Sequence, residues 1–211
     1  MKFRSRVLAF GSVALLVAAV CGVRAGVYIG GTPIHTEYDL FSGAGFEADV
    51  FSFVYAGVDS DLPDDPLFVP LNEGETLFVY FMRNVGDTGD VDLLGLLNPA
   101  ELNPSAVGVS SLAPDGWLED DRVNPVVFEG STSLVQYQWD EFFSDLLAPG
   151  DWAVMFYRVT GFWQPVDGFV GLGSDLDSHQ IPGPAPIPEP AAVCLLLAGM
   201  LVVVRRRARR A

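Results

Sequence analysis

The sequence predicts an all-β protein built around one antiparallel β-sandwich or jelly-roll-like domain. Three observations support this fold class. Short runs rich in aromatic and β-branched residues recur along the chain, and clusters of Gly, Pro, Asn and Asp separate them. Between residues 26 and 178 no stretch sustains the apolar spacing of an amphipathic helix. Short strands with frequent turns are typical of antiparallel sheets packed in two layers.

Residues 1–25 are predicted to form a secretory signal helix. A basic start at residues 2–6 precedes an apolar run at residues 7–20, and Val23-Arg24-Ala25 supplies small residues at the two positions that a signal peptidase reads. This order is that of a signal peptide, so we predict cleavage after Ala25. Lipoprotein processing at Cys21 is the alternative, although the residue before Cys21 is a bulky valine.

The next segment, residues 26–178, is the predicted folded domain. Its five clearest strand candidates are residues 47–55, 76–82, 126–128, 135–139 and 152–160. In residues 135–139 apolar and polar side chains alternate, which predicts a half-buried strand. Residues 152–160 are the most apolar, which predicts a strand in the interior of a sheet. Residues 140–147 fit one or two helical turns, and residues 92–97 are equally ambiguous.

The charge of the middle of the chain excludes one class of partner. Residues 26–187 contain three arginines, no lysine and 26 acidic residues, a formal charge of −23. Such a surface repels nucleic acid and anionic lipid. Both cysteines, Cys21 and Cys194, lie in the apolar end segments, so the predicted domain has no disulfide and depends on its core for stability.

Proline punctuates the end of this region. Residues 179–187 have proline at almost every second position near their end. Because proline lacks an amide donor and favours an extended backbone, we predict that these residues form a semi-rigid stalk.

The C-terminal segment, residues 188–211, combines three features. Pro188, Glu189 and Pro190 precede an apolar run at residues 191–204. As a helix this run is about 21 Å long, short of the roughly 30 Å core of a bilayer. A basic tail follows and places the C-terminus in the cytoplasm; its arginines are Arg205, Arg206, Arg207, Arg209 and Arg210.

This arrangement resembles the PEP-CTERM sorting signal. The resemblance covers about residues 187–211 and is strengthened by the N-terminal signal. It implies recognition by an exosortase, a membrane protease, at the motif Pro188-Glu189-Pro190, with Arg205–Arg210 as the basic stop. The resemblance further implies a membrane-anchored precursor, with the domain outside, and a product at the cell surface or in the extracellular matrix. An ordinary membrane anchor at residues 191–204 is the alternative.

Catalytic signatures are absent from the sequence. His35 and His179 are the only histidines, too few for a typical zinc triad, and they are expected at the surface. No G-x-S-x-G, phosphate-binding loop or dinucleotide-binding glycine pattern occurs. A glycoside hydrolase with paired catalytic carboxylates remains an alternative, because 26 acidic residues provide many pairs by chance.

Two weaker binding signals remain. Asp87, Asp90 and Asp92 cluster in a glycine-containing turn, where oxygen ligands could bind calcium; a solvated acidic turn is the alternative. Trp117 and Trp163 lie near turns and are candidates for stacking on a sugar, whereas two other tryptophans, residues 139 and 152, fall in strand patterns and are expected in the core. No other cofactor is predicted.

We therefore expect an exported, non-enzymatic protein with a structural or adhesive role at the cell surface or in the matrix. A carbohydrate-binding module acting on exopolysaccharide is the first alternative. An Asp/Glu-based glycoside hydrolase is the second alternative.

Overall fold

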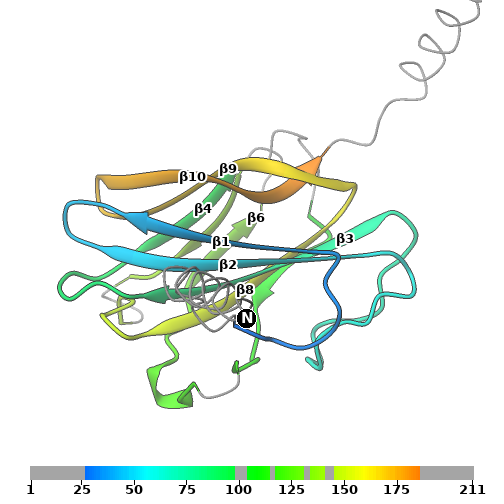
Figure 1. Cartoon of the computed structure of the whole chain (residues 1–211), viewed down its shortest axis with the longest axis horizontal. Helices are drawn as coiled ribbons and strands as arrows, with labels where there is room; N and C mark the ends of the chain where they lie inside the picture. The colour runs from blue at the N-terminus through cyan, green and yellow to red at the C-terminus, as the bar shows by residue number, and fades with distance from the viewer. Residues whose placement is uncertain (1–26, 98–103, 115–116, 131–133, 141–144, 186–211) are drawn as a thin grey trace, which may run out of the picture.

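The described part of the computed structural model comprises residues 27–97, 104–114, 117–130, 134–140 and 145–185. These residues form ten β-strands and a short 3₁₀ helix, η1 (Glu119–Asp121). The strands make two five-stranded antiparallel sheets that lie one over the other (Figure 1). The predicted all-β fold is thereby confirmed for these residues. The predicted signal helix and C-terminal helix lie outside them.

Sheet 1 contains both of the strands with the longest buried apolar runs. Its order is β1-β2-β3-β8-β5. The bounds are β1 (His35–Ser42), β2 (Glu47–Ala56), β3 (Glu75–Asn84), β8 (Trp152–Thr160) and β5 (Ala106–Val109). The predicted segments 47–55, 76–82 and 152–160 are therefore strands β2, β3 and β8. As expected, β8 lies in the sheet interior, between β3 and β5.

Sheet 2 has the order β10-β9-β4-β7-β6. The bounds are β10 (Asp175–Ala185), β9 (Phe162–Leu172), β4 (Leu93–Leu97), β7 (Leu134–Gln138) and β6 (Val127–Gly130). The alternation predicted around residues 135–139 is present, because Val135, Tyr137 and Trp139 are buried while the residues between them are half-buried. Most of the ambiguous segment 92–97 belongs to strand β4.

The main core lies between the sheets, and both contribute to it. Two buried tyrosines link the layers through hydrogen bonds. The Tyr80 hydroxyl of sheet 1 donates to the Pro182 carbonyl of sheet 2 at 2.5 Å. In the opposite direction, the Tyr137 hydroxyl donates to the Phe156 carbonyl at 2.6 Å. Because a buried hydroxyl without a partner is costly, these bonds favour one lateral placement of the two sheets.

A second core covers the outer face of sheet 1. Side chains such as Phe81 and Val154 pack there under loop residues that include Phe68 and Leu112. Strands β3 and β8 are thus buried on both faces, from Glu75 to Met82 and from Trp152 to Val159. Burial on both faces explains why their sequences are continuously apolar rather than alternating.

The predicted stalk at residues 179–187 is wrong for residues 179–185. These residues complete strand β10, which pairs along its length with β9. Proline is tolerated because β10 is the edge strand of sheet 2, and Pro182 lies opposite Pro165, so neither position supplies an amide donor. Ile181 and Pro182 are buried, as are the next two residues. Residues 186 and 187 lie outside the described residues.

Edges β1 and β10 meet where the two sheets approach each other. The Ser42 amide donates to Asp177 Oδ2 at 2.8 Å, and the Ala44 amide donates to Asp175 Oδ2 at 2.5 Å. Figure 1 shows the two strands next to each other. We call this contact the seam. Nowhere in the described ranges is there a helix with the length and apolar character needed to cross a membrane.

Candidate functional site

The three aspartates of the calcium prediction do not converge. Asp92 Oδ2 accepts a hydrogen bond from the Gly173 amide at 2.8 Å, which ties the loop to the β9–β10 turn. Asp87 instead lines a hollow on another part of the surface. Among the described residues, no group of three or more His, Cys, Asp or Glu side chains is placed to hold a metal ion.

All four tryptophans contact other protein side chains or backbone. Trp139 and Trp152 are buried, as predicted, and their indole N–H groups donate to the carbonyls of Val123 and Leu118 at 2.8 and 3.0 Å. Trp163, in β9, is half-buried, and His35 stacks on its ring with centroids 4.1 Å apart. One face of the Trp163 ring is therefore covered.

Trp117 differs because it borders an open space. Its ring meets the Phe81 ring edge-on, with centroids 4.9 Å apart. The Arg83 guanidinium carbon lies 4.6 Å from the centre of the Trp117 ring, a cation–π contact. The predicted sugar-stacking tryptophan is thus paired with an arginine.

The space beside Trp117 is an open hollow of about 640 Å³. Its lining combines aromatic, cationic and acidic side chains. The residues that matter chemically are Asp49, Phe51, Arg83, Asp87 and Trp117. We call this feature the Arg83 hollow. Its volume lies within the range of small-molecule sites.

Strand register brings the polar groups of the Arg83 hollow together. Asp49 near the start of β2 lies directly opposite Arg83 near the end of β3. Both side chains lie on the outer face of sheet 1. Successive strand residues point to opposite faces, and the sequence neighbours Ala48, Val50 and Met82 belong to the main core between the sheets. Residues 34 positions apart therefore form a cross-strand pair of opposite charge.

Trp117 reaches the hollow from a loop rather than from a strand. The Trp117 amide donates to the Pro114 carbonyl at 3.1 Å, and the Trp117 side chain packs against the second core on the outer face of sheet 1. Asp49 is buried, with 6% of its surface exposed, and accepts a hydrogen bond from the Tyr38 hydroxyl at 2.6 Å. The carboxylate is thus held in place by the neighbouring edge strand.

Arg83 is the least satisfied of the arginines in the described residues. Its Nε atom is buried without a hydrogen-bond partner there. Arg122, by contrast, donates to the Ser111 carbonyl at 2.9 Å and pairs with Glu119 at 3.1 Å. Among the described residues, Arg83 therefore makes fewer hydrogen bonds to the protein than Arg122 or Arg158.

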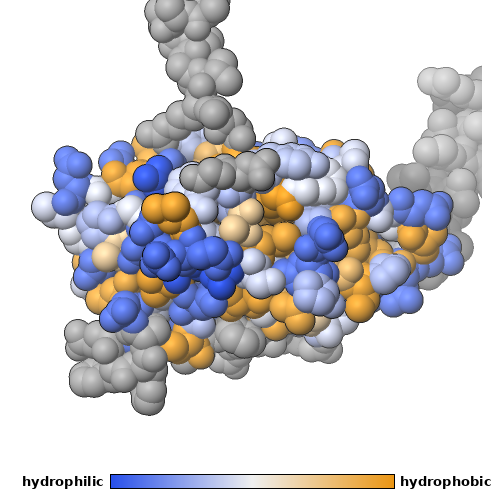
Figure 2. Space-filling model, turned by 90° about the horizontal axis from the view of Figure 1, so that it is seen from below, coloured by the Kyte–Doolittle hydropathy of each residue, from blue (hydrophilic) through white to orange (hydrophobic). Residues whose placement is uncertain are grey.

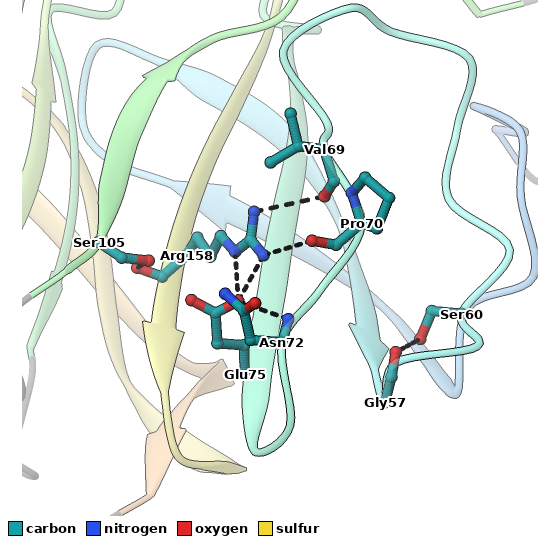
Figure 3. A network of polar contacts seen from close by, with 8 residues as sticks. All are labelled: Gly57, Ser60, Val69, Pro70, Asn72, Glu75, Ser105 and Arg158. Atoms are coloured by element: carbon teal, nitrogen blue, oxygen red, sulfur yellow. Dashed lines mark hydrogen bonds and ion pairs between the residues drawn. The ribbon is translucent and has the colours of Figure 1, made fainter.

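Arg158 forms a separate network that serves the fold. Figure 3 shows its guanidinium, from β8, between Glu75 of β3 and the loop carbonyls of Val69 and Pro70. Arg158 Nε donates to Glu75 Oε2 at 3.0 Å, and the Asn72 amide donates to the same oxygen at 2.7 Å. Burial alone would raise the pKa of Glu75, but the Asn72 amide and Arg158 outweigh it and hold this pKa below its ordinary value.

Of the two histidines that the sequence predicted at the surface, His179 lies at the seam and His35 stacks on Trp163 of β9. His179 Nε2 lies 3.1 Å from Asp177 Oδ2, and its Nδ1 lies 3.8 Å from Asp39 Oδ1. Both histidines are half-buried. Burial and the nearby Glu37 raise the pKa of Asp39. Burial also acts to raise the pKa of Asp177, but the Ser42 amide and His179 lower it further, so the net shift is downward.

The surface offers no single dominant apolar patch on the side shown in Figure 2. Hydrophobic residues reach the surface there in several areas interspersed with hydrophilic ones. Large exposed apolar side chains include Leu118, next to Trp117, and Leu67 and Val69 on the loop held by Arg158. The Arg83 hollow, with its mixture of charges and aromatic rings, is the more specific feature.

Sequence reasoning found two residues of the hollow, Trp117 and Asp87, but for separate roles. It missed Asp49 and Arg83, because only the fold places them together. One signal was available: Arg83 is among just three arginines in a segment with 26 acids. Comparison of the chain with protein-family models, curated proteins and solved structures finds no match.

Proposed function

We propose that this chain is an exported protein that acts structurally or adhesively at the cell surface or in the extracellular matrix. The observation that carries this proposal is the order of the terminal signals. A signal peptide at residues 1–25 is combined with Pro188-Glu189-Pro190, the apolar run 191–204 and an arginine-rich tail. These features resemble the substrates of an exosortase, so the precursor is held in the membrane and then processed.

Both ends give the same topology. A basic N-terminal region starts export, and the arginines after residue 204 hold the tail in the cytoplasm. The acidic domain between them lies outside the membrane in this proposal. The two antiparallel sheets around a shared core support the finer assignment of this domain as a β-sandwich or jelly-roll-like fold.

Mass spectrometry of both termini tests the proposal. Protein recovered from the surface of host cells should begin at Gly26 and should have lost Arg205–Arg210. In cells without the exosortase, or in a chain with alanine at positions 188–190, the C-terminal arginines should be retained. Mature surface protein that keeps Arg210 in normal cells would contradict sorting and favour a permanent anchor.

Carbohydrate binding is a second candidate function for the domain. The Arg83 hollow favours it, because carboxylates, a guanidinium and aromatic rings in one open site suit the hydroxyls and C–H faces of a sugar. Glycan-array binding by the full chain tests this candidate. The hydrolase alternative is distinguished by release of reducing sugar from the bound glycan, which a purely adhesive protein would not show.

A further inference from the structure

The Arg83 hollow presents hydrogen-bond donors and acceptors side by side. Arg83 contributes a guanidinium whose Nε has no partner in the described residues. Asp49 and Asp87 contribute carboxylates to the same lining. A guanidinium offers only hydrogen-bond donors, and ionised carboxylates offer only acceptors. The hollow is therefore suited to a ligand that both accepts and donates hydrogen bonds.

The charge of the lining argues against an ionic ligand. Two carboxylates and one guanidinium give the three groups a formal net charge of −1, within a region whose formal charge is −23. An anion would gain from Arg83 but would meet both carboxylates, and a cation would gain from the carboxylates but offers no acceptor for the Arg83 donors. An uncharged polyol uses all three groups, because a hydroxyl donates to a carboxylate and accepts from a guanidinium.

The remaining lining supplies apolar surface. Phe51 and Trp117 border the hollow together with Val27 and Pro149. Sugar rings carry C–H faces that pack on such surfaces while their hydroxyls form hydrogen bonds at the edge. The hollow, at about 640 Å³, has room for more than one pyranose ring.

We propose that the Arg83 hollow is a binding site for an uncharged saccharide, in which Arg83 donates the hydrogen bonds that orient the sugar. This inference rests on the carbohydrate-binding role proposed above and assigns it to one place on the domain. Asp49, fixed by the Tyr38 hydroxyl, accepts from sugar hydroxyls on the neighbouring strand.

Trp117 acts in this site as a positioning residue. Its ring lies against the Arg83 guanidinium and contacts Phe81 at its edge, so it holds the arginine at the wall of the hollow. This role adds to the predicted stacking of a sugar on Trp117, which stays a prediction.

The test uses the full chain, purified in a detergent without a sugar head group. Binding is measured by titration calorimetry with neutral hexose oligosaccharides (gluco-, manno- and galacto-hexaose) and with oligogalacturonate as the acidic arm. At least one neutral oligosaccharide should bind more tightly than oligogalacturonate. Arg83→Gln should weaken that binding by about tenfold or more, the effect of losing a charge-assisted hydrogen bond.

Matched variants separate binding from folding. Arg122→Gln makes the same charge change away from the lining, and its affinity should equal that of the unmodified chain. Arg83→Lys keeps the charge but loses the planar fork of donors, so it should also weaken binding. Trp117→Phe keeps an aromatic face and should preserve most of the affinity, whereas Trp117→Leu should lose it. Melting midpoints are measured for every variant.

Each outcome has a distinct meaning. If Arg83→Gln and Arg83→Lys do not change neutral-sugar binding, this site is contradicted, and the sugar binds elsewhere on the chain. Tighter binding of oligogalacturonate contradicts the uncharged class of ligand. Equal loss in Trp117→Phe and Trp117→Leu, with unchanged melting midpoints, contradicts positioning through the ring face. If none of the tested oligosaccharides binds, both this site and the carbohydrate-binding candidate function are contradicted.

Discussion

Arg158 shows how one cation can organise the outer face of sheet 1. Its side chain and that of Glu75 are about 90% buried, and its other donors go to carbonyls of the loop that covers the strands. A buried pair of this kind contributes little compared with apolar packing, but removing one partner leaves the other charge buried and unpaired. Arg158 is therefore needed for the loop to lie where it does.

Arg158→Met should lower the free energy of unfolding by about 3–5 kcal/mol, because Glu75 stays buried without its partner. Arg122→Met is the matched control: its partner Glu119 is largely exposed, so the expected loss of the ion pair is about 0–1 kcal/mol. Urea denaturation followed by tryptophan fluorescence measures both. Similar losses in the two variants would contradict the distinction.

The pH dependence of stability tests the state of Glu75. Its pKa in the folded protein lies below the ordinary value of 4.5, so its contribution is complete above that value and is lost as the pH falls through the folded pKa. The difference in unfolding free energy between the unmodified chain and Glu75→Gln should be constant from pH 6 to 7 and should shrink below about 4.5. A difference that grows on acidification would contradict the lowered pKa.

Strand β10 is the element whose prediction failed, and the reason is physical. Alternating proline ordinarily indicates an extended segment without partners. At the edge of a sheet, however, the outer side of the strand has no neighbouring strand and needs no amide donors. On the inner side, Pro182 lies opposite Pro165, so neither residue has an amide that must be paired. The sequence pattern carries no information about edge position, so a stalk and an edge strand look alike.

Ile181→Ala separates these two structures. A fully buried isoleucine in β10 should cost about 2–5 kcal/mol on truncation, while a stalk residue would cost almost nothing. Leu176→Ala, in the same strand but 53% exposed, is the control and should have a much smaller effect. Equal unfolding midpoints for the two variants in urea would contradict the placement of Ile181 in the core.

Predictability along the chain followed burial. Strands β3 and β8 were predicted because burial on both faces makes them continuously apolar, and the alternation near β7 was predicted because one of its faces is polar. Strand β1 was missed because Glu37 and Asp39 lie on the same face of the strand as buried Phe41, so its sequence, from His35 to Ser42, shows no purely apolar face. The Arg83 hollow could not be predicted, since Asp49, Arg83 and Trp117 meet only through sheet register and loop closure.

At the scale of the whole molecule, acidity is the dominant feature. The formal charge of −23 between residues 26 and 187 opposes compaction, and screening by salt reduces this repulsion. The described acids do not gather into a metal-binding group, which predicts a general effect of ions rather than a specific one.

Calcium and magnesium chloride at equal millimolar concentrations should therefore raise the melting temperature by equal amounts. For a chain of this size each kcal/mol of stabilisation corresponds to about 2–4 °C. Differential scanning calorimetry with sodium chloride at matched ionic strength provides the control. A larger shift with calcium alone would instead support a site among Asp87, Asp90 and Asp92.

In the export proposed above, the position of β10 would also set an order of events. Because the last residues of β10 complete the pairing with β9 and enclose Ile181, the domain would acquire its full set of contacts only after Ala185 had crossed the membrane. Pro188 follows three residues later, a reach of about 10 Å in an extended chain. A sorting enzyme that cuts at this motif would thus work close to the end of the folded domain. Slow folding of β10 would give that enzyme a longer and more accessible segment to bind.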